Sequence, residues 1–491
     1  MKKRPSKEEL LSQFYRTEKR VISVPRIPVV PVLVVVMLLT VVVLSGFLIS
    51  KADISFDFAS YEPKPRSPAG WTDDVRLTSD SNPDRYPDIS AKGDNVHIIW
   101  EKSITGVGTG YSDIYYKNST DGGFSWSNDI RLTDGINDVY CRKPDIGLNE
   151  SNIHIVWNRE KAGAPAETKE IYYRNSTDGG ISWGDTKMIS EDDDNSSEAP
   201  RCVVNGDNIH VAWVDSRFGS LQSEVYYRRS VDGGITWDNG LGDTTSDRRL
   251  THDFSNPGAP WIALNGSNIH VVFCDDRDTD FDVYYIRSTD NGATWDNGLG
   301  TVNEERKLTS NSTDHAPGAI AVEGDTIHVV WVDEIWPGPE YEIYYRNSTD
   351  NGASWGGAQQ LVGPSPLAWA PELECNESNV CMVWNDQRDD GSHSEVYIIN
   401  STNSGGDWGG VTRLTSVDNE HSGSPDIGFS DGKKYVVWVD LRYGNEEIYF
   451  KRSPDFPAVP EFPSLLLPIM FTIATYVAVS RYRKKERFRD E

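Results

Sequence analysis

Five of the nine histidines, four of the Asp-x-Arg tripeptides and an abundance of carboxylates are the residues of this sequence whose types and spacing could do chemistry. The histidines are His97, His154, His210, His270 and His328. Each stands at the same position of a recurring apolar run, so they lie whole units apart, whereas the ligands of a metal must converge on one point. We therefore expect them to stabilise the units, and we predict neither a metal site nor a cofactor.

Four Asp-x-Arg tripeptides follow the same apolar run, at Asp215 and Arg217, Asp275 and Arg277, Asp386 and Arg388, and Asp440 and Arg442. One interpretation is a salt bridge or turn within each loop. The other is a ligand-binding rim, because guanidinium groups and carboxylates can bind an anionic or sugar ligand. Aromatic residues that depart from the repeat are expected on the same face, at Tyr86, Tyr140, Trp261, Trp336 and Trp369. They suit stacking on sugar rings or filling of irregular blades.

These residues must be positioned by a unit that recurs seven times. A Pro enters an apolar run at Pro87, Pro144, Pro200, Pro260, Pro317, Pro371 and Pro425, at steps of 54 to 60 residues. Each unit adds a run that ends in an aromatic residue, a run with a Tyr pair, and a run close to Arg-Leu-Thr. The runs are short, rich in β-branched and aromatic residues, and bounded by turn residues. Four strands in each of seven units, with no helical period, predict an all-β fold, a seven-bladed β-propeller.

The most specific motif, Ser-x-Asp-x-Gly-x-x-Trp, lies between the Tyr-pair run and the Arg-Leu-Thr run. Its acidic positions are Asp121, Asp178, Asp232, Asp290 and Asp350, and a sixth copy carries Asn403. The carboxylate can accept bonds from the turn's own N–H groups, the Gly allows positive φ, and the Trp covers the hairpin. The motif resembles the Asp-box, or BNR, repeat of sialidases and related propellers, over residues 71–455. In that family the box is a structural turn.

The resemblance implies sialidase chemistry only if the family's site residues are present. Sialidases use three Arg, a Tyr activated by a Glu, and an Asp, with the first Arg in Arg-Ile-Pro near the start of a six-bladed propeller. The only such tripeptide here is Arg26-Ile27-Pro28, which precedes the propeller. Another glycosidase would need two carboxylates about 5 to 9.5 Å apart. The 75 Asp and Glu are too many to choose a pair, so we name no catalytic residue.

The repeat begins and ends in the middle of a unit. Residues 71–78 supply the second half of a unit, and Ser453-Pro454-Asp455 ends the chain's last unit at the first half of a box. We expect the N-terminal strand to complete the last blade and close the ring.

Two apolar segments flank the propeller and predict membrane attachment. We expect a basic cytoplasmic tail over 1–28, a transmembrane anchor over 29–50, a linker over 51–70 and the propeller over 71–455. A Pro-rich linker over 456–462, a second transmembrane helix over 463–480 and a basic cytoplasmic tail over 481–491 follow. Pro460-Glu461-Phe462 before this span resembles the Pro-Glu-Phe class of archaeal C-terminal sorting signals, which implies an archaeal cell-surface protein. A cleaved signal peptide and an ordinary second helix are the alternatives.

The expected exported part carries glycosylation sequons and few cysteines. The sequons begin at Asn118, Asn149, Asn175, Asn195, Asn265, Asn311, Asn347, Asn376 and Asn400. Cys375 and Cys381 flank a predicted hairpin turn, across which we expect that they can form a disulfide.

Charge and motifs together favour a binding protein. The net charge of -27, which concentrates to about -35 in the propeller, excludes the basic surface that nucleic acid requires. We expect a non-catalytic cell-surface propeller, with an extracellular body and both termini in the cytoplasm, that binds glycans or proteins. The alternatives are a sialidase-like exo-glycosidase and a scaffold of a membrane complex.

Overall fold

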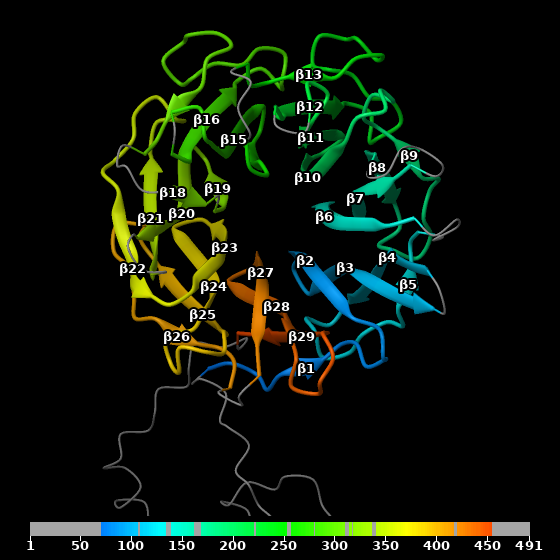
Figure 1. The fold of residues 1–491 in the computed structure, drawn as a ribbon, viewed down its shortest axis with the longest axis vertical. Helices are drawn as coiled ribbons and strands as arrows, with labels where there is room; N and C mark the ends of the chain where they lie inside the picture. The colour runs from blue at the N-terminus through cyan, green and yellow to red at the C-terminus, as the bar shows by residue number, and fades with distance from the viewer. Residues whose placement is uncertain are drawn as a thin grey trace, which may run out of the picture. The chain divides into compact units, whose positions relative to one another are not determined.

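The computed structural model describes residues 70–453, except 107–108, 134–138, 162–167, 220–221, 253–256, 279, 310–313, 317, 336–339 and 417–419. These residues form seven antiparallel sheets, six of four strands and one of five. Figure 1 shows the sheets as blades arranged around a central axis. The seven-bladed all-β propeller predicted from the repeat is confirmed. Among the described residues there is no helical stretch with the length and hydrophobicity that a bilayer crossing needs; the segments 29–50 and 463–480 lie outside them.

The innermost strands, in order from blade 1 to blade 7, are β2 (Asp84–Lys92), β6 (Cys141–Asn149), β10 (Ser197–Asn205), β14 (Trp261–Asn265), β18 (Asp314–Ala316) with β19 (Ile320–Glu323), β23 (Ala368–Asn376) and β27 (Ser422–Ser430). The second strands are β3 (Asn95–Gly106), β7 (Asn152–Glu160), β11 (Asn208–Asp215), β15 (Asn268–Asp275), β20 (Thr326–Ile335), β24 (Asn379–Asp386) and β28 (Lys433–Asp440). The third strands are β4 (Thr109–Ser119), β8 (Lys169–Ser176), β12 (Glu224–Ser230), β16 (Asp282–Ser288), β21 (Glu340–Ser348), β25 (Glu395–Ser401) and β29 (Glu447–Arg452). The outer strands are β5 (Ile130–Arg131), β9 (Lys187–Met188), β13 (Arg248–Arg249), β17 (Arg306–Lys307), β22 (Gln359–Ser365), β26 (Thr412–Arg413) and β1 (Val75–Arg76).

The ring closes through its N-terminal strand. β1 pairs antiparallel with β29, so the last sheet has the order β1-β29-β28-β27 and contains both ends of the propeller. Glu447 of β29 accepts bonds from the side chains of Arg76, at 2.7 Å, and Thr78, at 2.6 Å. The closure predicted from the half units at the two ends is confirmed, and it removes the open edge that each end would otherwise expose.

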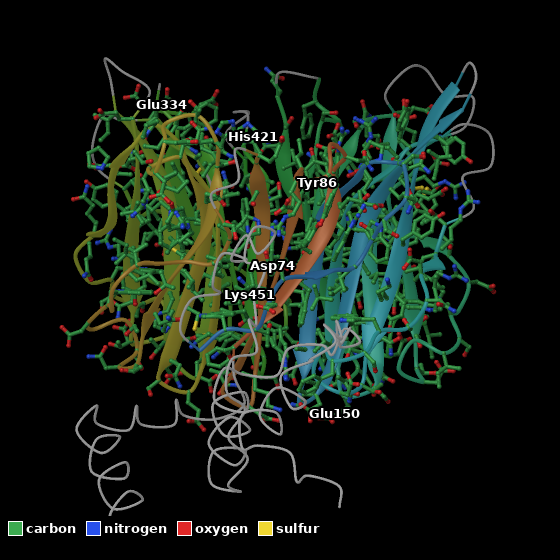
Figure 2. The ribbon with its side chains drawn as sticks, turned by 90° about the horizontal axis from the view of Figure 1, so that it is seen from below. Asp74, Tyr86, Glu150, Glu334, His421 and Lys451 are labelled. Atoms are coloured by element: carbon green, nitrogen blue, oxygen red, sulfur yellow. The ribbon has the colours of Figure 1, made fainter. Side chains whose placement is uncertain are left out.

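The two ends of each blade define two faces of the ring. The box face carries the first hairpins and the Ser-x-Asp-x-Gly-x-x-Trp turns, called box turns below; Gly179 N of a box turn donates to Ser151 O of a first hairpin at 2.9 Å. The mouth face is the opposite one, where the Asp-x-Arg loops join the second and third strands. In Figure 2, Tyr86 and His421 lie toward the mouth face and Glu150 lies toward the box face.

The inner strands share a bulge where they reach the mouth face. The residue before the recurring Pro has positive φ at Tyr86, Lys143, Ala199, Ala370 and Ser424, between 47° and 51°. A register shift accompanies the bulge in each of these strands. A Pro cannot donate to the ladder, and a bulge accommodates it while bending the strand toward the channel.

The core lies between neighbouring blades and is locked by the box turns. In the second box turn, Ser182 N donates to Asp178 Oδ1 at 2.8 Å, and hydrogen bonds from Ser182 lower the pKa of Asp178 to about 2. Gly180 has φ +89, and a Cβ there would lie 2.1 Å from Tyr116 Oη of the blade before. Trp183 meets the Tyr116 ring edge-on, with centroids 5.0 Å apart. The box turn therefore joins two blades as well as its own hairpin.

The same contact recurs around the ring. Gly and Trp of a box pack on an aromatic ring of the preceding blade at Gly123 and Trp126 on Phe450, Gly234 and Trp237 on Tyr173, Gly292 and Trp295 on Tyr227, Gly352 and Trp355 on Tyr285, and Gly405 and Trp408 on Tyr345.

The predicted disulfide between Cys375 and Cys381 is wrong, because all five cysteines are free. In the β23–β24 hairpin Cys375 pairs with Val380, and Cys381 pairs with Glu374. The two thiols therefore stand on neighbouring cross-strand pairs, whose side chains point to opposite faces of the blade.

Candidate functional site

The five recurring histidines are buried partners of tyrosines in their own blades. Each Nδ1 lies 2.6 to 2.7 Å from a phenol Oη, in the pairs His97–Tyr116, His154–Tyr173, His210–Tyr227, His270–Tyr285 and His328–Tyr345. Burial lowers the pKa of His97 to about 4 and that of His210 to about 3. These imidazoles are neutral and hold the tyrosines that receive the box turns. Among the described residues, no three His, Cys, Asp or Glu side chains are grouped as a metal ion needs.

The Asp-x-Arg loops lie on the mouth face, and each Arg is bonded within its own blade. Arg217 donates to Asp215 at 2.8 Å and to Asp247 at 2.7 Å, and its guanidinium lies 4.0 Å from the centre of the Tyr226 ring. The other three loops repeat the ion pair and the stacking, at Asp275, Arg277 and Tyr284, at Asp386, Arg388 and Tyr397, and at Asp440, Arg442 and Tyr449. The four guanidinium groups therefore brace the loops that surround the mouth.

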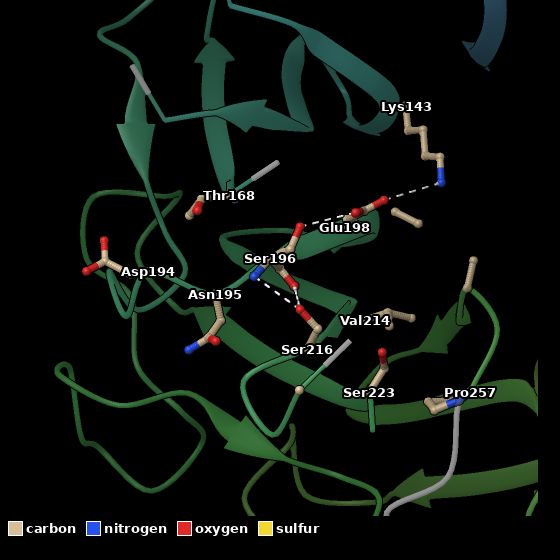
Figure 3. Close-up of a pocket in the computed structure, with 13 residues that line it drawn as sticks. Lys143, Thr168, Asp194, Asn195, Ser196, Glu198, Val214, Ser216, Ser223 and Pro257 are labelled. Atoms are coloured by element: carbon tan, nitrogen blue, oxygen red, sulfur yellow. Dashed lines mark hydrogen bonds and ion pairs between the residues drawn. The ribbon is translucent and has the colours of Figure 1, made fainter. Parts of the chain in front are cut away.

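A pocket of about 570 Å³ opens on the mouth face where blades 2, 3 and 4 meet (Figure 3). Its lining is mixed: small apolar residues such as Val214, Pro257 and Ala259 lie beside the polar side chains of Lys143, Thr168, Asp194, Asn195, Ser196, Glu198, Ser216 and Ser223. Glu198 accepts a bond from Lys169 Nζ at 2.8 Å and lies 4.0 Å from Lys143 Nζ. Burial opposes the charge of Glu198, but the bond from Lys169 prevails and lowers the pKa of Glu198. The pocket thus offers two carboxylates, an ammonium group, an amide and several hydroxyls.

A second polar group lies deeper, where the inner strands line the channel. Arg201 of blade 3 reaches Asp145 of blade 2 at 3.0 Å and Glu372 of blade 6 at 3.4 Å. Its guanidinium also lies 5.0 Å from the centre of the Trp261 ring of blade 4. Since blades 3 and 6 stand on opposite sides of the ring, this group, called the channel cluster below, bridges the channel.

Carboxyl groups of the channel are held at unusual pKa values. Burial raises the pKa of Glu372 to about 7, although Arg201 opposes the shift, and burial raises that of Glu374 to about 8. Burial and the neighbouring Asp426 raise the pKa of Asp88 well above its usual value. Three of the recurring carboxylates also join neighbouring blades: Asp88, Asp145 and Asp426 accept bonds from the backbone of the next inner strand at 2.6 to 2.8 Å.

The aromatic residues expected on this face have different surroundings. Tyr86 and Trp369 are exposed, by 49% and 42%, and Trp369 packs edge-on against Tyr341. Tyr140 lies under the guanidinium of Arg142, at 4.1 Å. Trp261 belongs to the channel cluster, and Trp336 lies outside the described residues.

Sequence reasoning missed Arg201, Glu372 and the pocket. A signal for the channel cluster was present: the residue after the recurring Pro is Asp in three units, but Arg201, Trp261 and Glu372 in others. The pocket had no such signal, because its residues come from strands and loops of three blades that are distant in the sequence.

Most of the sequons lie on the box face. Asn118, Asn175, Asn347 and Asn400 directly precede box turns, and Asn149, Asn265 and Asn376 end inner strands at first hairpins. Asn195 lies at the mouth-face pocket, and Asn311 is outside the described residues.

Comparison with solved structures shows the fold. An ulvan lyase, described as a new family of polysaccharide lyase, aligns at a TM-score of 0.54 and 13% identity, over 75% of this chain and 93% of its own. The Hadza microbial sialidase Hz136 gives 0.43 and 15%, over 70% and 73%, and Trypanosoma rangeli sialidase with the inhibitor DANA gives 0.42 and 12%, over 80% and 57%. No protein-family model and no curated protein matches the sequence. At 13% identity the likeness to the lyase shows a shared propeller fold alone.

Proposed function

We propose that this propeller is a cell-surface binding protein that recognises a neutral, hydroxyl-rich glycan at its mouth face without catalysing a reaction. The pocket of about 570 Å³ carries the proposal. Its volume suits a small sugar ligand. The Glu198 carboxylate and the hydroxyls of Ser216 and Ser223 can exchange hydrogen bonds with sugar hydroxyls.

The charges near the pocket favour a neutral ligand over an acidic one. The Arg groups that could bind a carboxylate are ion-paired in their own blades, and the propeller as a whole carries about -35 charges. The exposed rings of Tyr86 and Trp369, on the same face, supply surfaces on which sugar rings can stack.

Titration calorimetry with neutral oligosaccharides tests this function. Glu198→Gln should weaken binding at least tenfold, because it removes the charged acceptor that Lys169 holds in the pocket. Glu150→Gln, an exposed carboxylate of the box face, is the matched control and should leave the Kd unchanged. Absence of binding by any neutral oligosaccharide, or equal loss in both variants, would exclude the proposal.

A glycoside hydrolase is the second candidate, and Glu372 favours it. A carboxylic acid with a pKa of about 7, beside a Trp ring and an Arg, resembles the general acid that a glycosidase needs. The two functions differ in one measurement: glycan release that Glu372→Gln abolishes indicates the enzyme, whereas binding without release indicates the binding protein.

We propose further that the segments 29–50 and 463–480 hold the propeller at a membrane. The described chain enters and leaves the ring side by side on the box face, where Thr72 N donates to Arg452 O at 3.0 Å. The two described ends of the chain, which lead to these segments, therefore lie together at one edge of one face. Fractionation that recovers the full chain with membranes after alkaline extraction supports this attachment, and recovery in the soluble fraction refutes it.

A further inference from the structure

The box face carries exposed apolar side chains on blades 1 to 4. Phe124 and Ile181 of the first two box turns are 71% and 85% exposed, and five more lie on blades 3 and 4, opposite the edge where the chain enters and leaves. Ile235, Leu241, Leu299 and Val302 are 60% to 72% exposed, and Val231 is 49% exposed. We call these five residues the leucine patch. Exposed apolar side chains that gather on one part of a surface indicate a contact with a partner or a membrane.

The leucine patch is built on rigid turns. Leu241 and Leu299 lie in two Asp-Asn-Gly-Leu-Gly loops that follow the third and fourth box turns. In the first loop Asp238 accepts from Gly240 N at 2.6 Å, and Asn239 Oδ1 accepts from Leu241 N at 3.0 Å. The second loop repeats both bonds.

These loops also extend the patch from blade to blade. Gly240 lies so close to the fourth box turn that a Cβ would be 2.1 Å from Gly292 O, and a Cβ at Gly298 would be 2.2 Å from Gly352 O. Each exposed Leu is therefore fixed over the boundary between its own blade and the next. Preorganised turns lose little conformational freedom when their tips are covered.

The box turns of this sector have no glycan acceptor. A sequon Asn precedes the boxes of blades 1, 2, 5 and 6, whereas Arg229 and Arg287 stand at that position in blades 3 and 4. Each Arg is paired across its hairpin, Arg229 with Asp238 at 3.1 Å and Arg287 with Asp296 at 3.0 Å. The exchange removes the acceptor from these two box turns; the sequon of this sector is Asn265, at the first hairpin of blade 4.

We propose that the leucine patch rests on the lipid surface of the membrane that anchors the chain, an inference that depends on the anchoring proposed above. The linker 456–462 spans at most about 25 Å, so the C-terminal segment would keep the box face near the bilayer. The anchors are tethered to blade 7, and the leucine patch lies across the ring on the same face. Two contacts at opposite edges orient the box face toward the lipid and the mouth face outward. Aliphatic tips on exposed turns suit burial at the interface between headgroups and acyl chains.

The experiment places fluorescent labels on the full chain in phosphatidylcholine nanodiscs that contain brominated lipid. Single cysteines are introduced as Leu241→Cys on the patch, Tyr86→Cys on the mouth face and Thr40→Cys in the apolar segment, in a Cys375→Ser background, because the other native thiols are buried. We expect lipid quenching at position 241 to exceed that at position 86 at least threefold. Leu299→Ser with Val302→Ser should reduce the quenching at position 241 by half or more.

The labels separate failure of the contact from failure of the anchor. Strong quenching at position 40 with equal quenching at positions 241 and 86 refutes the lipid contact and leaves the anchoring in place. No quenching at position 40 refutes both. A label at position 241 that is shielded from a water-soluble quencher in detergent, to an extent that rises with protein concentration, assigns the patch to a second copy of the chain. That result refutes the lipid contact.

Discussion

The contact between a box turn and the preceding blade can be tested at two adjacent glycines. Gly179 and Gly180 of the second box turn have φ of +71 and +89, so an alanine at either position is held in the left-handed region, at a cost of about 1 kcal/mol. A Cβ at position 179 meets nothing within 4 Å, whereas at position 180 it would lie 2.1 Å from Tyr116 Oη. Gly179→Ala is therefore the matched control for Gly180→Ala.

The difference between the two variants can be estimated from the contacts that Tyr116 must give up. Moving its ring breaks the 2.7 Å bond to His97 Nδ1, worth about 1 kcal/mol, and weakens the edge contact with Trp183, worth about 1 kcal/mol. We expect Gly179→Ala to lower the free energy of unfolding by about 1 kcal/mol and Gly180→Ala by about 3 kcal/mol.

Urea denaturation followed by tryptophan fluorescence measures both values, because Trp183 lies in the contact. Adding Tyr116→Phe to Gly180→Ala removes the clashing oxygen and should restore part of the lost stability. Equal losses in the two single variants would refute the interblade contact and leave the box as a turn that serves its own hairpin.

Three further predictions follow from buried charge and from ring closure. Replacing His210 by Ala should destabilise the protein at pH 7 and progressively less toward pH 4. The folded state lowers the pKa of His210 to about 3, so acid protonates this side chain in the unfolded chain first and the stability that His210 contributes is lost as the pH falls. Denaturation at several pH values measures the free energy of unfolding of both proteins. Arg201→Met should cost about 3 kcal/mol by leaving Glu372 and Asp145 facing each other unpaired, and adding Glu372→Gln should recover part of it in a double-mutant cycle. Deleting residues 1–78 should expose the edge of β29 and produce oligomers in light scattering, whereas deleting residues 1–69, which spares β1, should not.

The fold was predictable because its signal is repeated. The Pro, the aromatic end of the second strand and the box each recur at nearly constant spacing, so one unclear unit is corrected by the others. Blade 5 illustrates this: its inner strand is split into β18 and β19 around Pro317-Gly318, yet the neighbouring strands establish the blade. The channel cluster was not predictable in the same way, because Arg201 and Glu372 lie 171 positions apart and meet only once the ring closes.

Departures from the repeat show which recurring residues act together. Blade 6 has Cys381 and Ile398 at the positions that hold a His and a Tyr in blades 1 to 5, as the strand registers show. The unit that follows it lacks both the Gly and the Trp of the box, since positions 457 and 460, where they belong, are Pro. Where no box follows, the His–Tyr pair that would receive it is also missing.

The contact between blade 7 and blade 1 departs from the repeat in a related way. The first box turn docks on Phe450, and Tyr435, which occupies the histidine position of blade 7, donates to Gly93 O at 3.1 Å. Here Phe450 takes the place of the tyrosine that contacts the box glycine in other blades. The phenol hydroxyl is instead supplied by Tyr435, on the neighbouring strand β28. The box turn, the aromatic ring that it contacts and the polar partner of that ring therefore change together across a blade boundary. This is expected if the contact between two neighbouring blades, rather than the single blade, stabilises the fold. Residues that recur belong to these contacts, so a ligand is expected to meet the residues that do not recur, in the pocket of the mouth face and in the channel cluster below it.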